Sequence, residues 1–318
     1  MEKQKIILIS GAAGFIGRNL IENLSKDILV KKIIAIDNFI SSDKDSFLDF
    51  LVLHKKVKFF EFDITKEHLT DYEINTLDEI YHLASIASPI FYKKLPVQTL
   101  DVGYLGTKNM LEIAKKYNSK ILFSSTSEVY GDAKVSPQSE DYYGNVNSFG
   151  ERSNYDESKR IAEALCYTYI KQFNLDVKIA RIFNTFGPHM MLNDGRIITE
   201  CIKALKFSTT LTIFGDGSQT RSISFISDTI SQLLRLMKTK CNIPVNIGNN
   251  IEISINKTVS MIEKIYGNTL KIKFCKLTQN DPLQRCPCLK LNNKVLGKTD
   301  YTKFEDGIIK TIDYFNST

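Results

Sequence analysis

The 318-residue chain has no apolar stretch long enough to span a membrane without interruption by charge, so the sequence predicts no membrane-spanning helix. Its N-terminus also lacks the basic region, apolar stretch and small-residue cleavage site of a secretory signal. The six cysteines are spread over the whole chain and do not form the spacing of a disulfide framework. We therefore expect reduced thiols and a cytoplasmic protein.

Clustered metal ligands and a basic stripe are missing as well. Cys286 and Cys288 form the one close pair of cysteines, and no histidine lies near them in the sequence, so we predict no bound metal. The formal net charge is +6, but the lysines are scattered, and nucleic-acid binding is not expected. A mild excess of positive charge suits anionic small molecules.

Short β-branched segments alternate with helix-like segments in the first half of the chain. Strands are predicted at KIILIS, KKIIAID, VKFFEFDI, EIYHLAS, KILFSS and VKIARIF. This alternation predicts an α/β fold, a Rossmann-type doubly wound parallel sheet. The pattern then becomes irregular, with helices expected at 194–207 and 254–266. We expect a dinucleotide-binding domain over 1–183 and a smaller α/β substrate lobe over 184–318, interleaved with the first.

The segment IILISGAAGFIG places Gly11, Gly14 and Gly17 between an expected strand and an expected helix. In a dinucleotide site the first glycine allows the tight turn, the second lets the backbone approach a pyrophosphate, and the third allows close helix–sheet packing. The N-terminus of the helix then offers free N–H groups to phosphate. A tight turn without a ligand would show the same spacing.

An acidic residue supports the dinucleotide interpretation. Asp37 ends the second expected strand, twenty positions after Gly17, where a carboxylate accepts both ribose hydroxyls and repels a 2′-phosphate. NAD is therefore favoured over NADP. Asp63, at the end of the third strand, is either an adenine contact or a cap. Further residues predicted to contact the cofactor are Phe15, Ile16, Asn38, Ile64, Leu83 and Ala84.

Tyr155 and Lys159 are four positions apart in a segment with helical periodicity, so both project from one helix face. A free tyrosine titrates near ~10, and a role as base at neutral pH requires a pKa lowered by roughly three units. A neighbouring ammonium and the positive nicotinamide ring together can lower the pKa this far. Such a pair is common by chance, but here it accompanies the glycine turn and the segment SSTSE.

The chain resembles the extended short-chain dehydrogenase/reductases that act on nucleotide sugars. Within these it is most similar to the UDP-glucuronate decarboxylase family, also called the UDP-xylose synthases. The resemblance is carried by HLASIASP, STSEVYGD, PQSEDYYGNVN, YDESKR, ARIFNTFGP, NDGR, GSQTR and DPLQRCP. It implies an enzyme that uses NAD to convert UDP-glucuronate to UDP-xylose through a 4-keto intermediate.

The resemblance also implies roles for single residues. Tyr155 takes the proton of the 4-hydroxyl while hydride passes to NAD, and Thr126 shares the hydrogen bond to that oxygen. Lys159 holds the nicotinamide ribose. The new ketone lies β to the carboxylate, so carbon dioxide leaves without removal of the carbon-5 proton. Glu128 positions the sugar and returns a proton.

The residue before this glutamate separates decarboxylases from many dehydratases. A 4,6-dehydratase needs an acid and a base side by side, and glucose-type dehydratases have an aspartate in this position. Here the position is Ser127. Some mannose-type dehydratases share the Thr-Ser-Glu triplet, so a 4,6-dehydratase or 4-epimerase remains an alternative. A non-catalytic dinucleotide sensor is a second one, although such proteins tend to lose the tyrosine or the lysine.

The carboxylate of the substrate needs a cationic partner, and an arginine binds it with two hydrogen bonds. The resemblance implies that Arg285 has this role, although a surface charge in a polar loop would look the same. The family pattern Arg-Lys-Pro-Asp here has Cys286 and Cys288 in place of the lysine and the aspartate. Further substrate contacts are expected from Ser85, Ala87, Tyr92, Asn184, Arg196 and Arg221.

Two more positions depart from the family pattern. Gly103 stands where asparagine is usual, which we expect either to loosen the local structure or to change rates, and NFISSDK lacks the usual glycine after the second strand. His82, at the end of a buried strand, is predicted to be a packing residue. The helix 104–117 and the helix after Tyr155 carry apolar residues on more than one face, which in this family accompanies a homodimer.

Overall fold

The computed structural model describes residues 3–66, 74–276 and 284–317, so the first three residues of DPLQRCP lie outside it. Its centre is a parallel sheet with the strand order β11-β6-β5-β4-β1-β2-β3. The strands are β1 Lys5–Ser10, β2 Val30–Asp37, β3 Val57–Glu61, β4 Glu79–His82, β5 Lys120–Thr126, β6 Val177–Ile182 and β11 Pro244–Ile247. The six strands predicted in the first half are confirmed, and so is the fold class.

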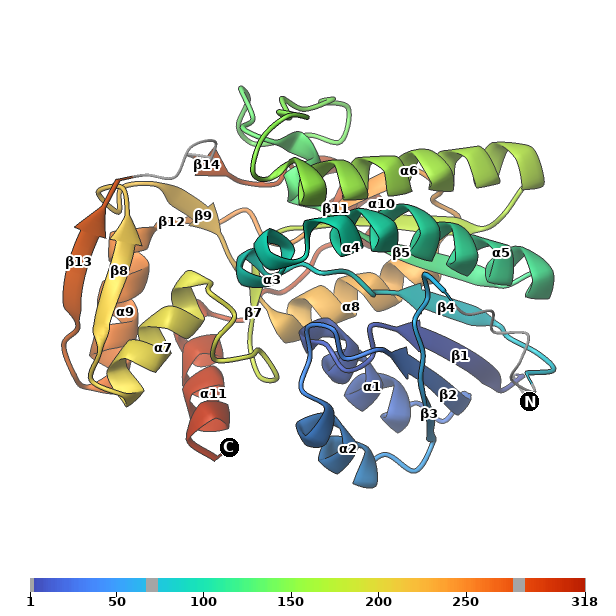
Figure 1. Ribbon diagram of the computed structural model, residues 1–318, viewed down its shortest axis with the longest axis horizontal. Helices are drawn as coiled ribbons and strands as arrows, with labels where there is room; N and C mark the ends of the chain where they lie inside the picture. The colour runs from blue at the N-terminus through green and yellow to red at the C-terminus, as the bar shows by residue number, and fades with distance from the viewer. Residues whose placement is uncertain (1–2, 67–73, 277–283, 318) are drawn as a thin grey trace.

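Both faces of the sheet are buried, because side chains alternate along each strand. In β1, Ile7 and Ile9 pack into one core, while Leu8 packs into the other. Helices cover the two faces, as Figure 1 shows. They are α1 Phe15–Lys26, α2 Lys44–Val52 and α8 Ile226–Met237 for the first core, and α5 Thr107–Tyr117 and α6 Ser153–Phe173 for the second.

The second half of the chain builds small sheets beside the main one (Figure 1). β9 Thr220–Ser222 pairs with β12 Glu252–Ser254 and β14 Gln284–Arg285, and β8 Thr210–Phe214 pairs with β13 Lys271–Cys275. β7 Thr185–Phe186 pairs with β10 Ser224–Phe225. The accompanying helices are α7 Ile197–Lys206, α9 Ile255–Tyr266, α10 Lys290–Leu296 and α11 Phe304–Ser317. The main sheet nevertheless takes its edge strand β11 from this half.

Helical structure before α5 begins earlier than predicted. α3 Pro89–Lys94 and α4 Pro96–Asp101 precede a π-helical turn at Val102–Gly106, which leads directly into α5. None of the helices in the described residues is both long and apolar enough to cross a membrane.

Gly103 lies in this π-helical turn and faces α6 at close range. A Cβ atom at this position would be 2.5 Å from the Cβ of Ser158 and 2.6 Å from its carbonyl oxygen. The glycine therefore leaves no gap, and the expected loosening is wrong. Because Ser158 occupies the space, the turn needs a residue without a side chain here.

We expect Gly103→Ala to lower the free energy of unfolding by about 1–3 kcal/mol, the usual cost of overpacking. Thermal unfolding followed by circular dichroism measures the loss. Combining it with Ser158→Gly should recover part of the stability, since one of the three close atoms is the Ser158 Cβ and contacting sites are not additive. A Gly103→Ala protein as stable as the parent would contradict this packing account.

Candidate active site

A cavity of about 920 Å³ opens at the carboxyl ends of β4, β5 and β6 and extends to the small sheets. Ligands of parallel α/β sheets bind at this edge. Most of the residues predicted for cofactor, substrate and catalysis line it, and those from the second half reach it from β9, β14 and the segments near α7. The predicted residues in its wall are Phe15, Ile16, Leu83, Ser85, Ala87, Tyr92, Thr126, Ser127, Glu128, Tyr155, Lys159, Asn184, Arg196, Arg221 and Arg285.

The glycines of the turn between β1 and α1 let backbone segments pack closely together. Gly11 has a φ of +71°, and a Cβ on it would lie 2.6 Å from the Ala84 nitrogen. A Cβ on Gly17 would lie 2.4 Å from the Gly11 oxygen. The cap of α1 is Gly14, which makes no side-chain hydrogen bond, so the first turn keeps N–H groups for an anion. These features fit the pyrophosphate of NAD.

Asp37 ends β2 beside this turn. Its carboxylate accepts hydrogen bonds from the Ala13 nitrogen at 3.0 Å and the Phe39 nitrogen at 2.9 Å. Burial raises the pKa of Asp37, and these hydrogen bonds oppose the rise. Phe39 supplies the left-handed conformation for which glycine is usual, with a φ of +57°. Its ring packs 5.4 Å from the ring of Phe59, and this contact stabilises the strained residue.

The other predicted adenosine-side residues are engaged in local turns. Asp63 accepts hydrogen bonds from the backbone nitrogen and the hydroxyl of Thr65. The side-chain oxygen of Asn38 accepts one from the Ile40 nitrogen, and Ile64 is buried. Asp63 therefore has the geometry of a cap, which is one of the two roles that the sequence left open.

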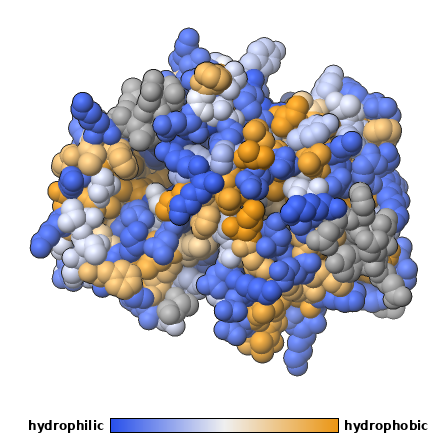
Figure 2. Space-filling model, viewed as in Figure 1, coloured by the Kyte–Doolittle hydropathy of each residue, from blue (hydrophilic) through white to orange (hydrophobic). Residues whose placement is uncertain are grey.

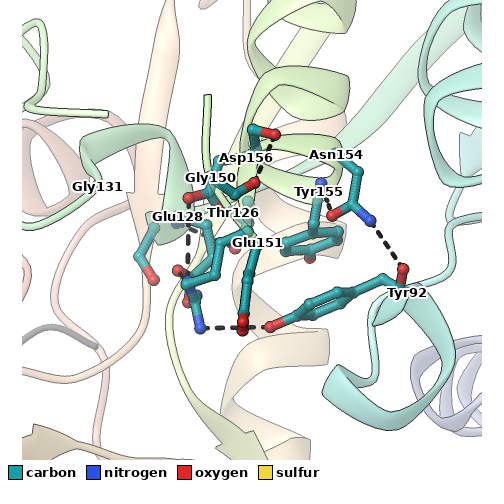
Figure 3. A network of polar contacts seen from close by, with 12 residues as sticks. Tyr92, Thr126, Glu128, Gly131, Gly150, Glu151, Asn154, Tyr155 and Asp156 are labelled. Atoms are coloured by element: carbon teal, nitrogen blue, oxygen red, sulfur yellow. Dashed lines mark hydrogen bonds and ion pairs between the residues drawn. The ribbon is translucent and has the colours of Figure 1, made fainter. Parts of the chain in front are cut away.

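Tyr155 projects from α6 into the cavity, where it is buried. Its ring stacks on that of Tyr92, with 5.2 Å between centroids and 9° between planes, as Figure 3 shows. Burial raises the pKa of Tyr155, the negative Glu128 raises it further, and the hydrogen bond with Thr126 lowers it. Lys159 does not bind the phenol, because its Nζ donates to the Ser124 carbonyl at 2.7 Å.

Burial also lowers the pKa of Lys159, to about 7. The expected lowering of the tyrosine pKa is therefore not produced by the side chains of this chain. The reason is that Lys159 is turned to the backbone and shares its buried environment, so desolvation disfavours both charged forms.

Glu128 lies in the 3₁₀ turn Ser127–Tyr130 that follows β5. One of its oxygens pairs with Arg285 and the other with Arg152. Burial alone would raise the pKa of Glu128, but the two guanidinium groups outweigh it and lower the pKa to about 2. The glutamate is therefore a carboxylate throughout the physiological range.

Arg285 is 4% exposed, so it is not a surface charge. Its guanidinium also donates to the Ser127 hydroxyl and the Gly131 carbonyl, both at 3.3 Å. The segment that follows is held through its backbone: the Cys286 nitrogen donates to the side chain of Gln138 at 2.8 Å, and the Cys288 nitrogen donates to the Gln138 carbonyl at 2.7 Å. These bonds are made by backbone nitrogens, so they do not depend on the side chains at positions 286 and 288. The segment that carries Arg285 is therefore held in place despite the two cysteine substitutions.

The remaining substrate-side predictions lie farther along the cavity. Arg221 of β9 is the register partner of Arg285, and its Nη1 donates to the Thr220 carbonyl at 2.9 Å. Arg196 precedes α7 and forms an ion pair with Asp194 at 3.1 Å. Asn184 lines the same wall.

His82 is confirmed as a packing residue. Its two ring nitrogens bind the hydroxyls of Ser10 and Thr107, at 2.8 and 3.1 Å. Burial lowers the pKa of His82 to about 3, helped by the nearby Lys159, so the ring is neutral.

Two charged residues near Glu128 were missed by the sequence analysis. Arg152, immediately before α6, lines the cavity, and Asp156 in the first turn of α6 is 6% exposed. Both belong to GERSNYDESK, where an arginine and an acid around a helix start usually are solvated caps. The available signal was that Arg152 stands three positions before Tyr155 and four before Asp156, spacings at which side chains on a helix become neighbours.

The pKa of Asp156 is raised to about 7 by burial and by Glu128, against the opposing effect of Arg152 and Arg285. An unfolded aspartate titrates near ~3.9. Between these two pH values the folded chain binds more protons than the unfolded chain, so the free energy of unfolding falls as the pH rises, and the full penalty is present above the folded pKa.

Asp156→Asn removes this penalty. Relative to the parent, we expect the variant to gain roughly 1–4 kcal/mol of unfolding free energy between about pH 4.5 and pH 8. Urea unfolding at both pH values measures the change, with the exposed Asp49→Asn as the matched surface control. A stability difference that is the same at both pH values would show that Asp156 does not titrate abnormally.

Comparison with known proteins places the chain in a family. Residues 7–248 match the NAD dependent epimerase/dehydratase family. UDP-glucuronic acid decarboxylase 1 of Xenopus tropicalis is 40% identical over 312 residues, which cover 98% of this chain and 72% of that protein. UDP-glucuronic acid decarboxylase 5 of Arabidopsis thaliana is 40% identical over 302 residues, 95% of this chain and 86% of the relative.

A solved structure agrees over the whole length. UDP-glucuronic acid 4-epimerase from Bacillus cereus, in complex with UDP-glucuronic acid and NAD, superposes with a TM-score of 0.87 at 30% identity, covering 98% of this chain and 99% of that one. The chain therefore belongs to the NAD-dependent epimerase/dehydratase family and, within it, to the UDP-glucuronic acid decarboxylases.

Proposed function

We propose that this protein converts UDP-glucuronate to UDP-xylose and carbon dioxide through a 4-keto intermediate, with NAD reduced and reoxidised in each cycle. The observation that carries the proposal is the position of Arg285. Its buried guanidinium contacts Ser127 and Glu128, which follow the end of β5, and the residue before Glu128 is a serine and not an acid. Such a group can bind the carboxylate of an acidic sugar with two charge-assisted hydrogen bonds.

The glycine turn, Asp37 and the wall formed by Phe15, Ile16 and Leu83 are proposed to hold NAD. When bound there, NAD⁺ would supply the acceptor for the hydride of carbon 4 and a positive charge in the cavity. The region 1–183 would thus bind the cofactor and 184–318 most of the nucleotide sugar, with Asn184, Arg196 and Arg221 on the diphosphate and uridine.

Tyr155 is proposed to remove the proton of the 4-hydroxyl, with Thr126 as second hydrogen-bond partner of that oxygen. The stack on Tyr92 fixes the phenol in the plane needed for this transfer. Lys159, neutral or charged near pH 7, is placed one helical turn away to bind the nicotinamide ribose and to stabilise the phenolate when charged.

The ketone at carbon 4 accepts the electron pair of the breaking carbon–carboxylate bond as an enolate. Decarboxylation therefore needs a fixed carboxylate and a later proton at carbon 5, but no base at that carbon. Arg285 orients the carboxylate. Glu128, held ionised by its two arginines, positions the sugar and guides the returning proton through water.

A homodimer is a further part of the proposal. Apolar side chains are exposed on the face formed by α4, the π-helical turn and α6, where Figure 2 shows orange atoms gathered. They are Val97, Leu100, Tyr104, Leu105, Ile161 and Tyr167. A second copy of this face would cover them.

All six cysteines are free, as we expect in a cytoplasmic protein.

Purified protein incubated with UDP-glucuronate and NAD should release carbon dioxide and form a UDP-pentose, identified by mass spectrometry. A UDP-sugar that keeps six carbons would instead support a 4-epimerase or dehydratase, the reaction type of the Bacillus cereus neighbour. Lack of any conversion would favour a dinucleotide sensor.

Arg285→Ala should lower kcat/KM for UDP-glucuronate roughly 100- to 1000-fold, because losing a buried partner of a charged group costs ~2–5 kcal/mol. Arg285→Lys keeps the charge but loses the bidentate hydrogen bonding, so its kcat/KM should lie between those of the parent and of Arg285→Ala. Steady-state rates measure both, with UDP affinity as the control for an intact nucleotide site. An alanine variant that keeps a rate close to the parent would remove Arg285 from the mechanism.

A further inference from the structure

Glu128 is shared between two guanidinium groups that come from distant parts of the chain. Arg285 lies on β14 and pairs with one oxygen, and Arg152 lies immediately before α6 and pairs with the other. Neither arginine is free in this arrangement. If Arg285 is to bind the carboxylate of the substrate, its contact with Glu128 has to be given up or shared.

The two arginines are anchored differently. Apart from Glu128, Arg285 donates to two neutral oxygens, of Ser127 and Gly131, at 3.3 Å each. The contact that Arg285 would exchange is its ion pair with Glu128, so one carboxylate replaces another while the two neutral contacts remain. Arg152 instead lies within 4.0 Å of the Asp156 carboxylate, and its Nη1 donates to the Tyr92 hydroxyl at 3.3 Å.

These contacts connect Arg152 to the reacting tyrosine. The Tyr92 hydroxyl accepts its hydrogen bond, and the Tyr92 ring stacks on that of Tyr155. The Asn154 amide donates to the Tyr92 carbonyl at 2.8 Å. Figure 3 shows Tyr92, Tyr155 and Glu128 around one space, with Asp156 above them in this view. Arg152 thus ties the carboxylate and the aromatic stack to the start of α6.

A second carboxylate in this space demands a second cation. Arrival of a sugar acid beside Glu128 brings two negative groups together in a buried site, and a buried carboxylate left without a partner loses several kcal/mol. With Arg285 alone, one of the two would be unpaired. With Arg152 retained on Glu128, each carboxylate keeps one guanidinium.

We propose that Arg152 is a positioning residue that retains Glu128 and Tyr92 in place while Arg285 exchanges Glu128 for the carboxylate of the substrate. This inference rests on the proposed function. It makes Arg152 a determinant of the preference for an acidic over a neutral sugar, although Arg152 itself does not bind the acid group.

The test compares binding of UDP-glucuronate and UDP-glucose to the NAD-loaded protein by titration calorimetry. All proteins in the comparison carry Tyr155→Phe, which removes the proposed proton acceptor and so keeps the NAD-loaded protein from converting UDP-glucuronate during the titration. Arg152→Gln removes the charge and keeps a donor, and we expect the affinity ratio of the two ligands to fall about tenfold, within the range of coupled charged neighbours. Arg152→Lys should restore much of the ratio. Lys171→Gln, which removes an exposed positive charge in the last turn of α6 outside the cavity wall, is the matched control.

A second measurement separates positioning from general damage. In a Glu128→Gln background Arg285 is no longer held by a carboxylate, so Arg152→Gln should change the ratio little there. The inference would be overturned if Arg152→Gln changed the affinity ratio equally in both backgrounds, or if it lowered the affinity for both ligands by the same factor. A parent-like affinity ratio in Arg152→Gln would also overturn it. If the parent itself shows no preference for the acidic sugar, the proposed function fails instead. Thermal unfolding of each variant confirms that it is folded. If Arg152→Gln does not fold, the affinity ratio is measured instead on Arg152→Lys, provided that its unfolding profile matches that of the parent.

Discussion

One half-buried carboxylate, neutralised by two guanidinium groups, organises the site. Glu128 pairs with Arg152 and Arg285, and these residues come from the end of β5, the start of α6 and the short strand β14. Since a buried charge without partners is costly, this pairing draws three separate parts of the chain to the carboxyl edge of the sheet. The cavity between the main sheet and the small sheets takes its shape from that requirement.

Desolvation governs the remaining ionisable groups. It raises the pKa of Tyr155 and lowers the pKa of Lys159 to about 7, so the chain by itself favours the neutral form of each. It also raises the pKa of Asp156 to about 7. The site therefore holds one permanently ionised acid and several groups poised to change charge when a charged ligand enters. That arrangement suits a reaction in which a proton leaves the sugar and another returns.

The departures from the family pattern are compensated by neighbours. The side chain missing at Gly103 is replaced in space by Ser158. In NFISSDK, which lacks the usual glycine, Phe39 adopts a left-handed backbone and its ring packs on Phe59. Around Arg285 the backbone bonds to Gln138 do not depend on which side chains follow. In each case the geometry is preserved by contacts that a comparison of single positions does not reveal.

The sequence by itself determined the sheet, the glycine turn and the pair Tyr155 and Lys159, because each depends on local periodicity or on residues a few positions apart. It also identified Arg285, through a motif. Only the tertiary structure decided that Lys159 bonds to the backbone and that Arg152 is the second partner of Glu128. Those outcomes depend on burial and on contacts between residues far apart in the chain, and no local pattern encodes which of several nearby charges a folded cavity will bring together.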